Sequence, residues 1–159
     1  MAGSLAFAMP LEAFDQICPE IARAETHVCT VPEPGLPGVP PGPYLLREFY
    51  CTEPDCDCRR LLVQFLPLHG PGEIAASINY GWEKARFYKQ WSRDPDLWRE
   101  MAGATLEPLA EQGPHARIFL EIFDHVIKNQ SLVEHFRRHY RLVKAGLQRG
   151  GIGSSLATL

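Results

Sequence analysis

The chain has 159 residues, of which 45% are hydrophobic and 22% charged, and it carries a formal net charge of −3 with a pI of about 6.1. These values predict a single soluble domain with a hydrophobic core of its own, and they exclude a wholly disordered chain. A weakly acidic chain also lacks the excess positive charge that binding to nucleic acid or to an anionic membrane requires.

We expect neither a membrane-spanning segment nor an export signal. No apolar run approaches the ~20 residues that cross a bilayer, and residues 1–10 lack the basic start of a signal peptide. We therefore expect a cytoplasmic protein with neither a membrane nor nucleic acid as partner. The sequence leaves open an unknown protein partner and the oligomeric state.

The N-terminal part is expected to hold one helix and a linker. Apolar residues recur at helical spacing between positions 10 and 27, which predicts an amphipathic helix within segment 1–30, kinked or divided at Pro19. Residues 31–43 are rich in proline, which fixes φ and lacks a backbone donor, so we expect an extended linker there. A docking peptide for a proline-recognising partner is the alternative.

The middle of the chain is predicted to be β-structure. Residues 44–50, 61–67 and 73–80 have strand composition, and the turn at 68–72 joins the last two. Their short separation predicts an antiparallel meander of about three strands. With the helices predicted around it, this gives an α+β core over residues 44–149 of a single domain spanning 1–159.

Helices are expected in the last third of the chain. Asp94-Pro95 resembles a capped helix start, and residues 115–128 carry a wide apolar face. Ser131 and Glu134 have the spacing of a capping box, which predicts a second helix from Leu132 to the glycines at 150 and 151. Residues 150–159 are expected to form a flexible tail.

Three of the five cysteines lie close together as Cys51, Cys56 and Cys58, in the loop of the first predicted hairpin. Residues two apart in extended chain point to the same side, and the four residues after Cys51 can turn back, so three thiolates can meet at one ion. This C-x4-C-x-C spacing favours zinc. A disulfide suits a reducing compartment poorly, and iron–sulfur clusters usually have a fourth cysteine and other spacings. Arg59 and Arg60 follow directly and are suited to offset the thiolate charge.

A fourth ligand is sought on the last helix. His139 is the first choice for a Cys3His site, and His135, four residues earlier, is the second. Cys29, shortly before the linker, is the third. A hydrogen-bonded core histidine is the competing interpretation of either histidine.

The sequence resembles a group of small uncharacterised bacterial proteins. The likeness lies in the cysteine motif with Arg59-Arg60, in Ile78-Asn79-Tyr80-Gly81-Trp82-Glu83, and in Arg138-His139-Tyr140, and it covers about residues 42–145. The resemblance implies one fold and a metal site, and it implies no reaction.

Three functions follow from a metal at the cysteines. The leading one is a non-catalytic module in which zinc is structural and the role is binding a partner. The second is a zinc hydrolase with an open metal position, whose general base would be Asp57, Glu83 or Asp55. The third is a thiol-based redox or metal sensor, in which oxidation ejects the zinc.

Overall fold

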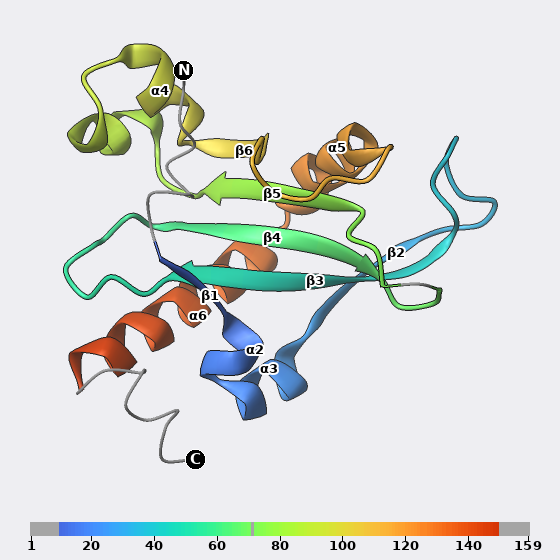
Figure 1. Cartoon of the computed structure of the whole chain (residues 1–159), viewed down its shortest axis with the longest axis horizontal. Coiled ribbons are helices and arrows are strands. Elements are labelled where there is room, and N and C mark those ends of the chain that lie inside the picture. The colour runs from blue at the N-terminus through green and yellow to red at the C-terminus, as the bar shows by residue number, and fades with distance from the viewer. Residues whose placement is uncertain (1–9, 71, 150–159) are drawn as a thin grey trace.

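The computed structural model of the chain describes residues 10–70 and 72–149. It confirms the α+β class, with helices packed against an antiparallel sheet (Figure 1). The sheet has six strands, so the prediction of about three strands was too low.

The predicted meander is present at the centre of this sheet. It consists of β3 (Gly42–Cys51), β4 (Arg60–Pro67) and β5 (Ala76–Gly81), paired antiparallel in chain order. A fourth strand, β6 (Gly103–Leu106), pairs with β5. The sequence analysis missed β6 because four residues that begin with glycine carry almost no alternation of polar and apolar side chains.

Two further strands share the outer edge of β3. β1 (Leu11–Ala13) pairs with residues 49–51, and β2 (His27–Val31) pairs with residues 42–46. Between them lie the short helices α2 (Phe14–Ile17) and α3 (Pro19–Glu25). The predicted helix over 10–27 was therefore wrong at both ends, where the edge of β3 offers backbone hydrogen bonds that outweigh a helical pattern. The predicted division of this helix at Pro19 is confirmed, since α2 ends at Ile17 and α3 begins at Pro19.

The proline-rich segment leaves the sheet as a loop. Val31 belongs to β2 and Gly42 to β3, so the irregular stretch is 32–41, closed by a bridge between Leu36 and Val39. In Figure 1 it projects at one end of the sheet, and the cysteine loop between β3 and β4 lies at the other end.

Four helical elements follow the meander: η1 (Ala85–Trp91), α4 (Pro95–Glu100), α5 (Ala116–Val126) and α6 (Gln130–Gln148). Asp94 caps α4 as predicted, because its side chain accepts from the backbone N–H of Asp96. The predicted capping box on Ser131 was wrong, since the Asn129 side chain caps α6 and accepts from Ser131 N–H at 3.0 Å. The predicted tail at 150–159 lies outside the described residues.

The core lies between the sheet and the pair α5 and α6. Phe65 on β4 packs against Phe119 with ring centroids 5.2 Å apart, and Tyr80 on β5 packs against Phe123 at 5.4 Å. None of the described helices is long and apolar enough to cross a bilayer.

Alternation along β3 decides which side chains face these helices. Tyr44 packs on Phe119 of α5, and the hydroxyl of Tyr50 lies 3.2 Å from the carbonyl oxygen of Phe136 in α6. Glu48 is an even number of residues from Tyr44 and Tyr50 and therefore also faces α6, whereas Cys51 points to the opposite face of the sheet.

Candidate metal centre

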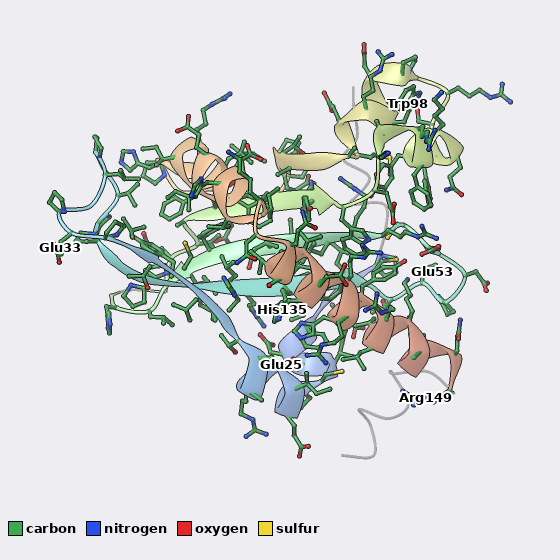
Figure 2. All side chains as sticks on the ribbon, turned by 180° about the vertical axis from the view of Figure 1, so that it is seen from behind. Glu25, Glu33, Glu53, Trp98, His135 and Arg149 are labelled. Carbon is green, nitrogen blue, oxygen red and sulfur yellow. The ribbon has the colours of Figure 1, made fainter. Side chains whose placement is uncertain are left out.

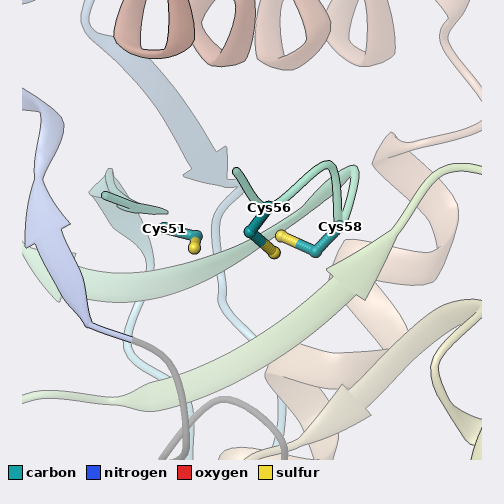
Figure 3. Close-up of side chains that lie close together, drawn as sticks. All are labelled: Cys51, Cys56 and Cys58. Carbon is teal, nitrogen blue, oxygen red and sulfur yellow. The ribbon is translucent and has the colours of Figure 1, made fainter. Parts of the chain in front are cut away.

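Cys51, Cys56 and Cys58 form a cluster that is positioned to hold a metal ion. Their sulfur atoms all lie within 4.8 Å of one another (Figure 3). Around a tetrahedral zinc with Zn–S bonds of ~2.3 Å, sulfurs lie about 3.8 Å apart, so small side-chain rotations close the site. Cys51 and Cys58 are buried and Cys56 is half-buried, which leaves one side of the cluster open to solvent.

The loop between β3 and β4 is shaped by a turn and by one unusual residue. Cys56 N–H donates to the carbonyl of Glu53 at 3.2 Å, closing a turn with Pro54 in the position that proline favours. Arg59 has a φ of 49°, and among the described residues no other non-glycine has a positive φ. Such a conformation costs of order 1–3 kcal/mol, so the surrounding contacts must stabilise it.

Side chains from α6 hold this loop in place. The hydroxyl of Tyr140 donates to Asp57 Oδ1 at 2.8 Å and accepts from the backbone N–H of Arg59 at 3.3 Å. Lys144 donates to the carbonyl of Glu53 at 3.0 Å. The Arg59 guanidinium pairs with Asp57 at 2.9 Å and with Glu83 at 3.2 Å.

The three thiols differ strongly in acidity in the metal-free protein. The hydrogen bond from the Cys58 thiol lowers the pKa of Cys51 to about 5, helped by the backbone N–H of Glu53 and by Lys144. The same thiol lowers the pKa of Cys56, and donating these hydrogen bonds raises the pKa of Cys58 itself. Cys51 therefore ionises first and Cys58 last, and a metal must displace the Cys58 proton.

A buried cation lies beside the cluster. Arg60 is 8% exposed and lines the same small cavity as Cys51 and Cys58, and its Nε donates to the carbonyl of Met101 at 3.1 Å. Burial lowers the pKa of Arg60, but guanidinium groups stay protonated in proteins. Three thiolates and one divalent cation carry a net charge of −1, which Arg60 offsets. The donors and their surroundings are thus suited to holding a metal ion.

The structure does not bring His139 to these sulfurs. Its ring lies on the face of β3 that carries Glu48 and Tyr50, and Cys51 points to the other face. Among the residues that the structure describes, no fourth cysteine, histidine or carboxylate joins the cysteine group. Cys29 pairs with Tyr44, seven residues along β3 from Cys51, which is about 23 Å at ~3.3 Å per residue.

His135 and His139 instead belong to a second group, with Glu25. Glu48, on β3, binds both rings: His139 Nδ1 lies 2.7 Å from its Oε1, and His135 Nε2 lies 3.1 Å from its Oε2. The hydroxyl of Tyr50 also donates to Glu48 Oε1, at 2.6 Å. The sequence analysis named neither Glu25 nor Glu48. The alternating pattern of β3 places Glu48 at an inward position, and a charged residue at such a position was the signal that could have identified it.

Glu48 is a buried, ionised carboxylate. Burial alone would raise its pKa, but the hydrogen bonds from His135 and His139, the electrostatic attraction of the His139 ring and the hydrogen bond from Tyr50 together lower the pKa to about 2. Glu48 is therefore charged at neutral pH and accepts from every partner. This charge orients both imidazoles.

No family model matches this chain, and no curated protein or solved structure is significantly similar to it. The functional conclusions therefore rest on the geometry and chemistry of the two groups.

Proposed function

We propose that the protein binds one zinc ion through Cys51, Cys56 and Cys58, and that this ion stabilises the loop between β3 and β4. The observation that carries the proposal is the convergence of three thiols within 4.8 Å at the end of a strand and in the loop that follows it. Thiolate ligands select zinc over magnesium or calcium.

The position of the three cysteines supports a structural role. Cys51 ends β3, and Cys58 lies two residues before β4 begins at Arg60. An ion bound to both therefore fixes the two strand ends, and the binding free energy of a structural zinc contributes directly to folding. The fourth coordination position is left to water or to an incoming group, because the described residues offer no fourth side chain of the usual kind.

A hydrolase is less well supported by the same geometry. Two of the three carboxylates that could act as general base, Asp57 and Glu83, are paired with Arg59. Three thiolates also donate charge to the ion and weaken it as a Lewis acid. A role in binding a protein partner and the likeness to the group of bacterial proteins both remain predictions.

Metal analysis of the full chain tests the proposal. We expect the triple variant Cys51→Ser, Cys56→Ser, Cys58→Ser to lose one equivalent of zinc relative to the wild type. The matched control replaces the other two cysteines, Cys18 and Cys29, by serine and should keep that equivalent. Cobalt in place of zinc should give the thiolate-to-metal charge-transfer absorption in the wild type and in the control.

Chelation supplies a second test. Removal of the ion should lower the melting temperature of the wild type and leave that of the triple variant unchanged. A wild type that binds cobalt without charge-transfer absorption, or that melts at the same temperature with and without chelator, would show that the cysteines do not form a structural metal site.

A further inference from the structure

The second group, on the helix-covered face of the sheet, shows an unusual pairing. His139 is 0% exposed, and its Nε2 has no hydrogen-bond partner among the described residues. Oε2 of Glu25 lies 3.7 Å away, which is too long for a hydrogen bond. A buried polar nitrogen without a partner destabilises a fold, so a ligand bound at this point would satisfy it.

The protonation of the His139 ring follows from its other nitrogen. Ionised Glu48 can only accept, so Nδ1, at 2.7 Å from its Oε1, must carry the proton. In a neutral imidazole Nε2 then carries a lone pair. The unpartnered Nε2 of His139 and the Oε2 atom of Glu25 thus face each other, and a metal ion between them would satisfy both.

We propose that Glu25, His135 and His139 form a second metal site, for a divalent first-row transition ion. The three side chains each offer one ligand atom, and these atoms all lie within 4.8 Å of one another. Figure 2 shows Glu25 on α3 and His135 on α6 on the same side of the molecule. Two imidazoles and one carboxylate are ligands for iron, cobalt, nickel or zinc, and the two nitrogen donors disfavour magnesium and calcium.

Neighbouring side chains hold the three ligands in position. Glu48 holds both imidazoles from behind, as carboxylates do for metal-bound histidines. Phe14 stacks on His139 with ring centroids 3.9 Å apart and fixes its orientation. Arg138 pairs with Oε1 of Glu25, so the other carboxylate oxygen, Oε2, faces His139.

Charge and space also fit a divalent cation. Glu25 and Glu48 are two acidic side chains and Arg138 pairs with one of them, so negative side chains exceed positive ones around the site. A cavity of about 30 Å³ lined by Glu25, Glu48 and His139 adjoins the group. That volume accommodates a water molecule, the ligand expected at a coordination position that the protein leaves open.

The site stands apart from the cysteine cluster. Glu48 and Cys51 are three residues apart on β3, or about 10 Å at ~3.3 Å per residue, and they point to opposite faces. The inference therefore does not depend on zinc at the cysteines. Cobalt separates the two sites, since only the thiolates give charge-transfer absorption.

The test measures metal content after chelation and equilibrium dialysis of the full chain against cobalt or zinc. We expect two equivalents in the wild type and one in Glu25→Gln and in His135→Ala, with the thiolate absorption retained in both. Both side chains are partly exposed, at 31% and 17%, so these variants should fold, which circular dichroism checks. The matched control is Glu20→Gln, which changes an exposed carboxylate on α3 outside the group. This variant should bind two equivalents of metal.

Two outcomes would overturn the proposal. The first is Glu25→Gln and His135→Ala proteins that bind as much metal as the wild type, with less than a tenfold loss of affinity. The second comes from nitrogen NMR of the imidazole rings. If both nitrogens of His139 are protonated and their signals do not move when metal is added, His139 is an imidazolium paired with Glu25 and no second metal site exists.

Discussion

Replacing Tyr140 by phenylalanine should loosen the cysteine loop without disturbing the core. The hydroxyl of Tyr140 is the contact through which α6 reaches Asp57, between two of the cysteines, and the backbone of Arg59. Phenylalanine keeps the ring, which packs edge-on against Trp82 with centroids 5.1 Å apart. The variant therefore removes two hydrogen bonds and little else.

The size of the effect follows from the exposure of the partners. A hydrogen bond to a charged group contributes about 1.5–3 kcal/mol and a neutral one about 0.5–1.5 kcal/mol. The Asp57 side chain is 60% exposed and keeps its ion pair with Arg59, so water replaces most of what the carboxylate loses. We therefore expect a loss of about 1–2 kcal/mol in the free energy of unfolding.

The affinity for zinc should fall in Tyr140→Phe together with the free energy of unfolding. Contacts that orient the ligands of a metal typically contribute a factor of ~10–100 in affinity, and Tyr140 orients the loop rather than a sulfur, so we expect about tenfold. Competition with a chromophoric chelator measures the affinity, and urea denaturation of the metal-free protein measures the stability.

Tyr44→Phe is the matched control for this variant. It also removes a buried tyrosine hydroxyl, one that donates to the carbonyl of Pro40 at 2.8 Å, about 23 Å along β3 from the cysteines. It should lower stability and leave zinc affinity unchanged. If Tyr140→Phe binds zinc as tightly as Tyr44→Phe does, the Tyr140 hydroxyl does not position the loop.

Three further predictions concern the fold around the two groups. Gly81→Ala would place a Cβ 2.1 Å from the carbonyl oxygen of Met101, so we expect a loss of about 3 kcal/mol or more in urea unfolding, and near-wild-type stability would contradict this close approach. Phe123→Ala should cost about 3–5 kcal/mol in the same assay, because the ring is fully buried, and a loss below about 1 kcal/mol would refute its place in the core. The pKa of Glu48 is lowered from 4.5 to about 2, so its contribution is present above pH ~5 and is lost as the pH falls toward 2, by about 3 kcal/mol in the metal-free protein. Calorimetry should show this loss in the wild type and a flatter acid profile in Glu48→Gln, and equal profiles would exclude Glu48 as the cause.

Features set by local chemistry could be predicted from the sequence. The strand composition of β3 and β4, the turn at Pro54 and the cap at Asp94 each depend on residues close in sequence, and the structure has all three. The N-terminal strands depend instead on the free edge of β3. Helical spacing over 10–27 was misleading there, because the partner that decides the conformation, β3, lies outside that segment of the chain.

The placement of His139 shows the same limit at the level of the site. The competing interpretation of His139 as a hydrogen-bonded core histidine agrees with its buried ring and its hydrogen bond with Glu48. The face of β3 against which α6 packs is a tertiary property, and it determines that His139 lies beside Glu48 and not beside Cys51. The alternation of side chains along a strand could have shown that Glu48 and Cys51 lie on opposite faces of β3. It could not have shown which of the two faces packs against α6.

The two groups should act independently although they share β3 and α6. His139 and Tyr140 are neighbours on α6 and reach the two groups separately, and no hydrogen bond or ion pair joins a described residue of one ligand set to one of the other. Effects at sites about 10 Å apart without shared partners usually add within ~0.5 kcal/mol, and coupling requires an element with two alternative arrangements. We therefore expect Glu25→Gln to change metal affinity at the cysteines less than twofold, and Cys58→Ser to leave the second group equally unaffected. Cobalt titration of each variant, followed by thiolate absorption and by total metal, measures both, and a tenfold change at the distant group would mean that α6 shifts when either ion binds.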